Sequence, residues 1–155
     1  MDDRSASGLR GNVSRELTNE DIEHLKTEII EIEADISVFK FNEGKRTGFS
    51  DRTGNINVKG DIFPDKDSTH PRDRMSERAV LAHEFYGHYN FAPSGFPIGD
   101  WRDEFRASYI AAINTPNLSQ DDRKYLILDA YERAKDSGYY FDFTKKAREI
   151  IYGST

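Results

Sequence analysis

The sequence contains no cysteine, no long apolar run and no visible stripe of basic residues. Without cysteine there is no disulfide and no thiolate metal site, so only His, Asp and Glu remain as realistic metal ligands. No apolar stretch approaches the roughly 18 residues that a membrane span requires. The net charge of -6 argues against nucleic acid as a main partner, because phosphate binding needs clustered Lys and Arg.

The N-terminal segment carries little information about structure. Residues 1–5 lack the basic and apolar regions of a signal peptide, so we expect a cytoplasmic protein, or a secreted or delivered domain excised from a larger chain. Residues 1–16 are polar, with two glycines and three serines, and predict a flexible lead-in. Residues 17–155 are long enough for one domain with its own core.

Cap and periodicity signals predict the order of the elements. Thr18 with Asp21 predicts the start of a helix whose apolar stripe is Ile22, Leu25, Ile29 and Ile32. Strands are predicted at 36–41, 46–50 and 55–63, with a hairpin turn at 51–54 between the last two. Later helices should begin at Ser76, Asp100, Ser119 and Thr144. We expect an α+β fold in which a small, mostly antiparallel sheet packs with the N-terminal helix, a motif helix and C-terminal helices.

The strand predicted at 55–63 has a second interpretation. Ile56, Val58 and Ile62 alternate on one face, and Gly60 leaves room for close backbone approach. An extended peptide could pair with such an edge, whereas the alternative is an ordinary hairpin strand with one buried face.

The most informative motif is His83-Glu84-Phe85-Tyr86-Gly87-His88, inside an otherwise apolar helical stretch. Histidines four residues apart lie about 40° apart around a helix and can share a zinc ion, with the glutamate as general base. Here they are five apart, which separates the rings by roughly 140° in a regular helix. Both can reach one ion only if the helix takes in an extra residue as a π-bulge at 85–87, and Gly87 lowers the steric cost of that turn. The alternative is a chance arrangement on an amphipathic helix.

A third ligand is expected from the next helix. Asp100 should cap it, Asp103 is a capping-box-like partner, and Glu104 lies in its first turn. The link at 90–99 is short and stiff enough to turn the chain back toward the motif. Small residues one turn on would let the helix approach the motif helix closely: Ala107, Ser108 and Ala111. The alternative makes Glu104 an ordinary acid that favours the helix dipole.

Together, two His nitrogens, one Glu oxygen and a water make the open four-coordinate site of a hydrolytic zinc enzyme. We therefore predict His83, His88 and Glu104 as ligands of Zn²⁺ and Glu84 as the catalytic base. His24 lies outside the apolar stripe and should be a surface residue. His70 is an expected loop residue that could serve as oxyanion donor, as could a tyrosine of the run at 139–143, which we otherwise expect to pack.

The two motifs resemble those of gluzincin peptidases of the dipeptidyl-peptidase III type, in which the glutamate of the second motif is the third zinc ligand. That resemblance implies the same ligands and the same base, Glu84. Asp103 matches the first acid of the second motif, Phe105 replaces its usual cysteine, and Ser108 replaces its final acid. The chain is far smaller and the interval between the motifs shorter, so dipeptide-releasing specificity is not implied.

Over more of its length the chain resembles the zincin-like metallopeptidase domains at the C-termini of bacterial polymorphic toxins. The resembling segments are 58–64, 75–82 running into the motif, and 101–112. This resemblance implies a toxin or effector that acts on a protein or peptide substrate, with a cognate immunity protein as a further partner. The alternatives are a catalytically inactive metal-binding or interaction domain of zincin fold, and a helical interaction module without metal.

Overall fold

The structure is a computed structural model that describes residues 15–65, 67–94 and 100–153. Most of the expected lead-in at 1–16 and half of the link at 90–99 lie outside the described residues. Arg15 already contacts the domain: its carbonyl accepts a hydrogen bond from the Gly60 N–H at 3.1 Å, and its guanidinium bonds to Asp21 at 2.9 Å. Residues 15 and 16 of the expected lead-in therefore belong to the described domain.

The described residues form six α-helices, three strands and four short 3₁₀ or π segments. The α-helices are α1 (Asn19–Glu31), α2 (Pro71–Arg74), α3 (Glu77–Ala82), α4 (Trp101–Asn114), α5 (Gln120–Asp136) and α6 (Lys145–Tyr152). The strands are β1 (Phe39–Phe41), β2 (Gly48–Ser50) and β3 (Asn55–Val58). The short segments are η1 (Ile36–Val38), η2 (Gly60–Ile62), η3 (His83–His88) and η4 (Tyr89–Ser94).

The α+β class is confirmed, but the expected sheet pattern is wrong. The strand order is β1-β3-β2: β3 pairs antiparallel with β2 and parallel with β1, so the sheet is mixed. The hairpin was visible in the local sequence, and Gly54 turns it with a φ of 74°. The parallel pairing joins segments far apart in the chain, which no turn signal encodes.

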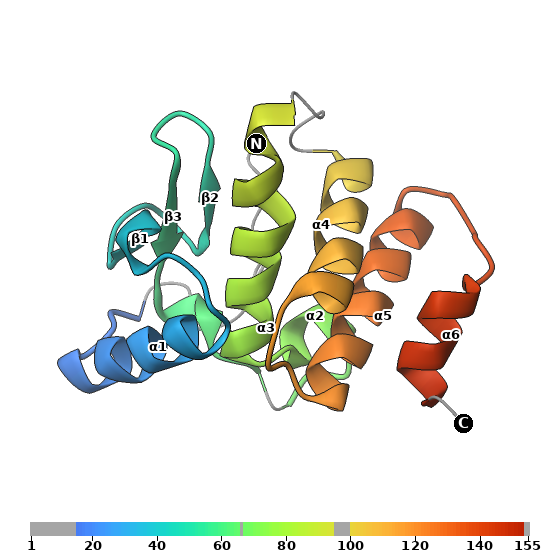
Figure 1. Cartoon of the computed structure of the whole chain (residues 1–155), viewed down its shortest axis with the longest axis horizontal. Coiled ribbons are helices and arrows are strands. Elements are labelled where there is room, and N and C mark those ends of the chain that lie inside the picture. Colours follow the sequence, from blue (N-terminus) through green and yellow to red (C-terminus); the bar gives the residue numbers. More distant parts are fainter. Residues whose placement is uncertain (1–14, 66, 95–99, 154–155) are drawn as a thin grey trace.

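The strand expected at 55–63 is shorter than predicted, and it lies in the centre of the sheet and not at its edge. It ends at Val58, and Gly60–Ile62 form a 3₁₀ turn. Because β3 is paired on both sides, it cannot accept an extended peptide, and the prediction of a binding edge there is wrong. The edge strand beside the motif helix is β2 (Figure 1).

The motif helix runs through the middle of the molecule, with the sheet on one side and α4 on the other (Figure 1). It continues α3 into η3, a π-helix that spans all six residues of the motif. The Tyr89 N–H bonds to the carbonyl of Glu84, five residues back, as well as to that of Phe85. The predicted helix bulge is thus confirmed, and it extends over more residues than expected.

Gly87 is needed for a different reason from the one expected. Its φ is not in the left-handed region, so the π turn does not require a glycine backbone. A Cβ at Gly87 would lie 2.5 Å from the carbonyl oxygen and 2.6 Å from the Cα of Ala107 on α4. The missing side chain lets the two helix backbones touch, and Arg106 adds a hydrogen bond to the Gly87 carbonyl at 2.9 Å.

The expected caps and core are present. Each predicted N-cap side chain accepts a backbone N–H, at Thr18, Ser76, Asp100, Ser119 and Thr144. The α1 stripe packs into the apolar core, where α1 contacts α3 and η1. The largest fully buried apolar residues are Leu25, Ile29, Ile32, Ile56, Ile62, Met75, Leu81, Leu126 and Ile127. Among the described residues, no helix has the length and apolar character to cross a membrane.

The aromatic run at 139–143 differs from the packing expected for it. Phe143 packs edge-on against Tyr131 at 4.7 Å between ring centroids. Tyr139, Tyr140 and Phe141 are exposed by 51%, 77% and 52%, although Tyr139 stacks on Trp101 at 4.8 Å. Phe143 packs against the core, whereas Tyr139 and Phe141 contact Trp101 and each other at the surface.

Gly87→Ala should lower the free energy of unfolding by about 1–3 kcal/mol, the usual cost of overpacking a close contact. Urea denaturation measures it. Ala107→Gly serves as a second background. The methyl group that Gly87→Ala adds would clash with the backbone of residue 107 as well as with its side chain, so removing the side chain does not relieve the clash. The penalty should therefore persist in the double variant relative to Ala107→Gly alone. Equal stability of Gly87→Ala and wild type would show that the helices can separate without cost.

Candidate metal centre

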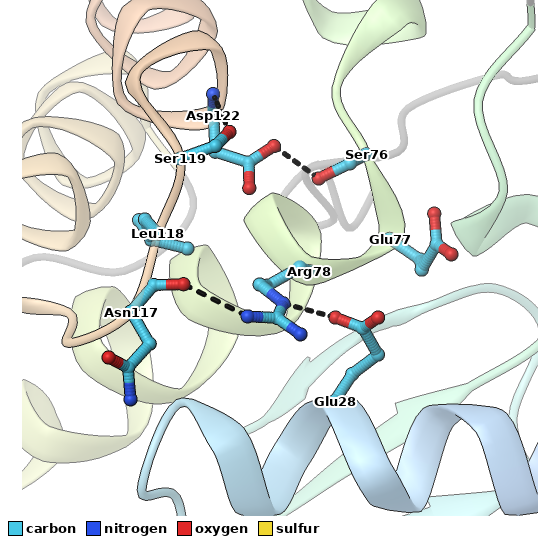
Figure 2. A pocket seen from close by; sticks show the side chains of 8 residues that line it. All are labelled: Glu28, Ser76, Glu77, Arg78, Asn117, Leu118, Ser119 and Asp122. Atoms are coloured by element: carbon cyan, nitrogen blue, oxygen red, sulfur yellow. Dashed lines mark hydrogen bonds and ion pairs between the residues drawn. The ribbon is translucent and has the colours of Figure 1, made fainter.

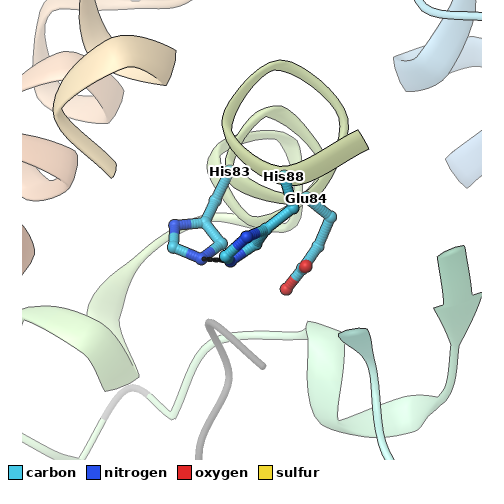
Figure 3. Close-up of side chains that lie close together, drawn as sticks. All are labelled: His83, Glu84 and His88. Atoms are coloured by element: carbon cyan, nitrogen blue, oxygen red, sulfur yellow. Dashed lines mark hydrogen bonds between the residues drawn. The ribbon is translucent and has the colours of Figure 1, made fainter. Parts of the chain in front are cut away.

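Three side-chain atoms from η3 and α4 converge in the interior. His83 Nε2 and His88 Nε2 lie 3.1 Å apart, and Glu104 Oε1 lies 3.0 Å from the first and 3.1 Å from the second. Ligands about 2.0–2.1 Å from a tetrahedral zinc are roughly 3.3 Å apart, so a small expansion of this triangle would fit one ion. The π turn brings the two rings to the same side of the helix, as Figure 3 shows.

Glu84 projects toward the same region as the two rings (Figure 3). One of its oxygens and one nitrogen from each of His83 and His88 lie within 4.8 Å of one another. Its Oε1 accepts a hydrogen bond from the backbone N–H of Phe49 on β2 at 3.0 Å. The Phe49 ring is nearly parallel to that of His88, with centroids 6.4 Å apart. Strand β2 therefore positions the glutamate and lies against one of the imidazoles.

The burial of these groups supports a cation between them. His83 and Glu84 are fully buried, and His88 and Glu104 are 3% and 2% exposed. Glu104 Oε2 is buried without a hydrogen-bond partner among the described residues. An unmatched buried carboxylate oxygen is costly, and metal coordination is one way to compensate it. The donor set of two imidazoles and a carboxylate suits zinc.

A second layer of polar residues surrounds the ligands. The Ser108 hydroxyl lies 2.7 Å from His83 Nδ1 and donates to Asp129 Oδ2 on α5, also at 2.7 Å. Asp129 further accepts from Arg72 Nε at 3.0 Å and from Arg133 Nε at 2.9 Å. These contacts connect the motif helix to α5 and α2.

Asp103 and Arg106 form another part of this layer, on the His88 side. Asp103 Oδ2 lies 3.7 Å from His88 Nδ1, and its Oδ1 accepts from Arg106 at 2.7 Å. Arg106 also lies over the Phe91 ring at 4.7 Å. Asp103 therefore pairs with charged neighbours inside the fold, although the sequence suggested a helix-cap role for it.

Burial and neighbouring charge give the two histidines opposite pKa shifts in the metal-free protein. Burial, reinforced by the charges of His88 and Arg133, lowers the pKa of His83 to about 4. Burial also disfavours the charged form of His88, but Glu104, Glu84 and Asp103 outweigh it and raise that pKa above its usual value of 6.5. His88 is therefore the imidazole that holds a proton where an ion would bind.

The two acids of the network are ionised. Burial opposes the charge on Glu104, but His88 and Arg133 outweigh it and hold the pKa of this carboxyl well below its usual range. Burial likewise opposes the charge on Asp129, yet Arg133 and Arg72 lower its pKa to about 2. Both carboxylates act as hydrogen-bond acceptors near neutral pH.

The remaining histidines lie in other clusters. His24 is exposed on α1 and pairs with Glu77 at 2.7 Å, as its position outside the apolar stripe predicted. His70 caps α2, with its Nδ1 accepting from the Arg72 N–H at 3.1 Å, and its cluster partners are Glu132 and Asp136. The structure thus groups His70 with acids of α5 and not with the motif, while an oxyanion role for it stays a prediction.

A surface pocket of about 480 Å³ lies where α1, α3 and the start of α5 meet (Figure 2). Its charged groups are already paired: Arg78 bonds to Glu28 and to the Asn117 carbonyl, and Ser76 donates to Asp122 at 2.6 Å. These contacts hold helices together at a distance from the motif. The pocket is therefore separate from the candidate metal centre.

Sequence reasoning missed Asp129, Arg133 and Arg72. They lie on α5 and α2. Asp129 is 21 residues from Ser108, and Arg72 is 57 residues from Asp129. The one available signal was the composition of α5, where Asp129 and Arg133 interrupt an apolar face four residues apart. Such an i, i+4 pair is usually a solvent-exposed ion pair, so the pattern did not indicate burial.

No protein-family model, curated protein or solved structure matches the chain. Support for a metal centre therefore comes from the motifs and the geometry described above.

Removing any one ligand candidate should lower zinc affinity by more than the roughly 10–100-fold that loss of an outer hydrogen-bond partner costs. We expect this of His83→Ala, His88→Ala and Glu104→Ala, measured by chelator competition. The matched control is Asp100→Ala, which removes the cap of the same helix at a cost of about 1 kcal/mol of stability and should keep the metal. Full zinc affinity in Glu104→Ala, with loss in Asp100→Ala or Asp103→Ala, would overturn the choice of third ligand.

Zinc affinity should fall as the pH falls through the pKa of His88. Below that pKa a proton occupies the imidazole, and metal and proton compete for it; above it the affinity levels off. Displacement of one proton changes the apparent affinity about tenfold per pH unit. Titrations between pH 5.5 and 8.5, corrected for protonation of the chelator, measure the slope. His24→Ala should leave it unchanged, and a flat profile would contradict the competition.

Proposed function

We propose that this chain is a zinc-dependent peptidase domain of the zincin type, with His83, His88 and Glu104 as zinc ligands and Glu84 as general base. The observation that carries the proposal is the convergence of three ligand atoms within 3.1 Å of one another, beside a buried glutamate held by a backbone N–H. Two imidazoles favour zinc over magnesium or calcium, which prefer oxygen ligands.

The position of Glu84 supports a role in proton transfer. Bound zinc supplies a Lewis acid that activates water and polarises a peptide carbonyl. The Phe49 N–H fixes one carboxylate oxygen of Glu84. The carboxylate can accept the water proton as general base. The same carboxyl group can then deliver that proton to the leaving amine.

The edge of β2 suggests how a peptide substrate would bind. Because Phe49 directs its N–H toward Glu84, the outer edge of this strand faces the motif helix. An extended peptide laid along β2 would lie next to the general base, and pairing with the Phe49 N–H would require it to replace the hydrogen bond to Glu84. Since His83 and Glu84 have no exposed surface, such a substrate reaches them only when the chain around the site opens.

A toxin or effector role is the second part of the proposal, and it rests on the resemblance of residues 58–64, 75–82 and 101–112 to polymorphic-toxin domains. The expected partners are a protein or peptide substrate and a cognate immunity protein. A delivered toxin domain and a cytoplasmic protein are both compatible with this sequence.

The burial of His83, Glu84, His88 and Glu104 favours one alternative, a non-catalytic metal centre. Structural zinc sites are closed by four protein ligands, and Glu84 is near enough to both histidines to be the fourth. In that case Glu84 would contribute to metal affinity, whereas a general base would not.

Glu84→Gln distinguishes the two functions. For the peptidase, glutamine should keep the fold and the zinc affinity and reduce proteolysis by about 10²- to 10⁴-fold, because it cannot accept the water proton. Zinc affinity is measured by chelator competition, and proteolysis by the appearance of new N-termini in a proteome extract. Loss of zinc together with activity would identify Glu84 as a ligand and favour the closed centre.

The same variant tests the toxin role. Wild type and Glu84→Gln are compared at equal zinc occupancy during cytoplasmic expression in bacteria. Growth inhibition should be present in the first and absent in the second. Equal inhibition by both would mean that the damage is done by binding.

A further inference from the structure

The position of one proton in the second layer follows from the hydrogen-bond partners. The Ser108 hydroxyl has a single hydrogen and lies 2.7 Å from both His83 Nδ1 and Asp129 Oδ2. The Asp129 carboxylate receives two guanidinium donors, from Arg72 and Arg133, so it is an acceptor toward Ser108. Ser108 therefore gives its hydrogen to Asp129 and can only accept from His83.

This hydrogen-bond direction determines the protonation of the candidate ligand atom, His83 Nε2. If His83 donates from Nδ1, its neutral ring has a free lone pair at Nε2. That nitrogen is the one that lies 3.0 Å from Glu104 Oε1 and 3.1 Å from His88 Nε2. In the opposite tautomer the Nε2 hydrogen would point to Glu104 Oε1 and occupy the position of a cation, so the Ser108 contact has to outweigh this second acceptor in the metal-free protein.

We propose that Asp129 is a positioning residue of the metal centre, acting through Ser108 to hold His83 in the tautomer that can bind zinc. The inference rests on the proposed metal centre, and it does not depend on peptidase activity. Arg72 and Arg133 serve by keeping both oxygens of Asp129 as acceptors, and Asp129 is fully buried. Through this chain of contacts, α5 and α2 contribute to the affinity of a site whose ligands lie on η3 and α4.

Ser108→Ala is the first test. It removes the hydroxyl that links His83 to Asp129, and alanine is smaller than serine, so no new clash arises. We expect zinc affinity to fall about 10–100-fold, as on loss of other outer-layer partners of metal-bound histidines. In the metal-free protein, ¹H–¹⁵N NMR should show His83 protonated at Nδ1 in wild type and shifted toward the Nε2 form in the variant. A purely structural role for Ser108 would leave the tautomer unchanged.

The matched control is Thr115→Val at the C-terminal end of the same helix. Thr115 is 1% exposed, and its Oγ1 has no hydrogen-bond partner among the described residues. Valine keeps the shape and removes only the hydroxyl, so zinc affinity and tautomer should match wild type. An equal loss of affinity in Thr115→Val and Ser108→Ala would show a general packing effect and overturn the inference.

Asp129→Asn tests whether the aspartate acts through the serine. In wild type we expect it to weaken zinc binding, because an amide offers one acceptor where Asp129 offers two. In the Ser108→Ala background it should have little further effect, since coupled residues are not additive. Equal losses in both backgrounds would show that Asp129 acts independently of Ser108. If Asp129→Asn fails to fold, Ser108→Ala with its tautomer measurement still decides.

The outcome also separates this inference from the proposed centre. If wild type binds no zinc, the metal centre itself is wrong. If wild type binds zinc and Ser108→Ala binds it equally with His83 in the same tautomer, the centre stands and the positioning role fails.

Discussion

Gly87 brings the backbone of the motif helix into contact with that of α4, and the relative positions of the candidate ligands depend on this contact. His83 and His88 lie on either side of Gly87 along one helix, and Glu104 lies one turn before Ala107 on the other. A side chain at residue 87 would push the helices apart and move the carboxylate away from both imidazoles. The small residues of α4, Ala107 and Ser108, allow the approach from the other side.

The close approach puts charge inside the protein, and the fold compensates it with arginines. Arg133 lies between Asp129 and Glu104, at 2.9 Å from the first and 3.7 Å from the second, and Arg106 pairs with Asp103. Breaking a buried ion pair typically costs more than a surface pair ever contributes, because the remaining charge stays desolvated. A bound cation would add to this balance by matching the unpaired oxygen of Glu104.

Local signals in the sequence were sufficient for most of the fold near the site. The capping residues, the apolar stripe of α1 and the π turn all follow from spacings within a few residues, and each is present. The edge strand and the parallel pairing of β1 with β3 were not predictable, because they depend on contacts between distant segments. The residues of the site divide in the same way. The convergence of His83, His88 and Glu104 was predicted from motif spacing. The contact of Asp129 with Ser108, and through it with His83, depends on the tertiary packing of α5 and was not predicted.

The π turn also determines how this helix can change length. One residue fewer between the two histidines would give the common four-residue spacing in a regular helix. Because the π turn already absorbs the extra residue, that deletion would leave the second histidine and the residues after it facing nearly the same way. The side chains inside the turn would change their packing instead, among them Phe85, which stacks on Tyr89 at 5.2 Å between ring centroids. A single deletion at 85–87 should therefore be tolerated better than a deletion elsewhere in this helix, where no bulge compensates the rotation.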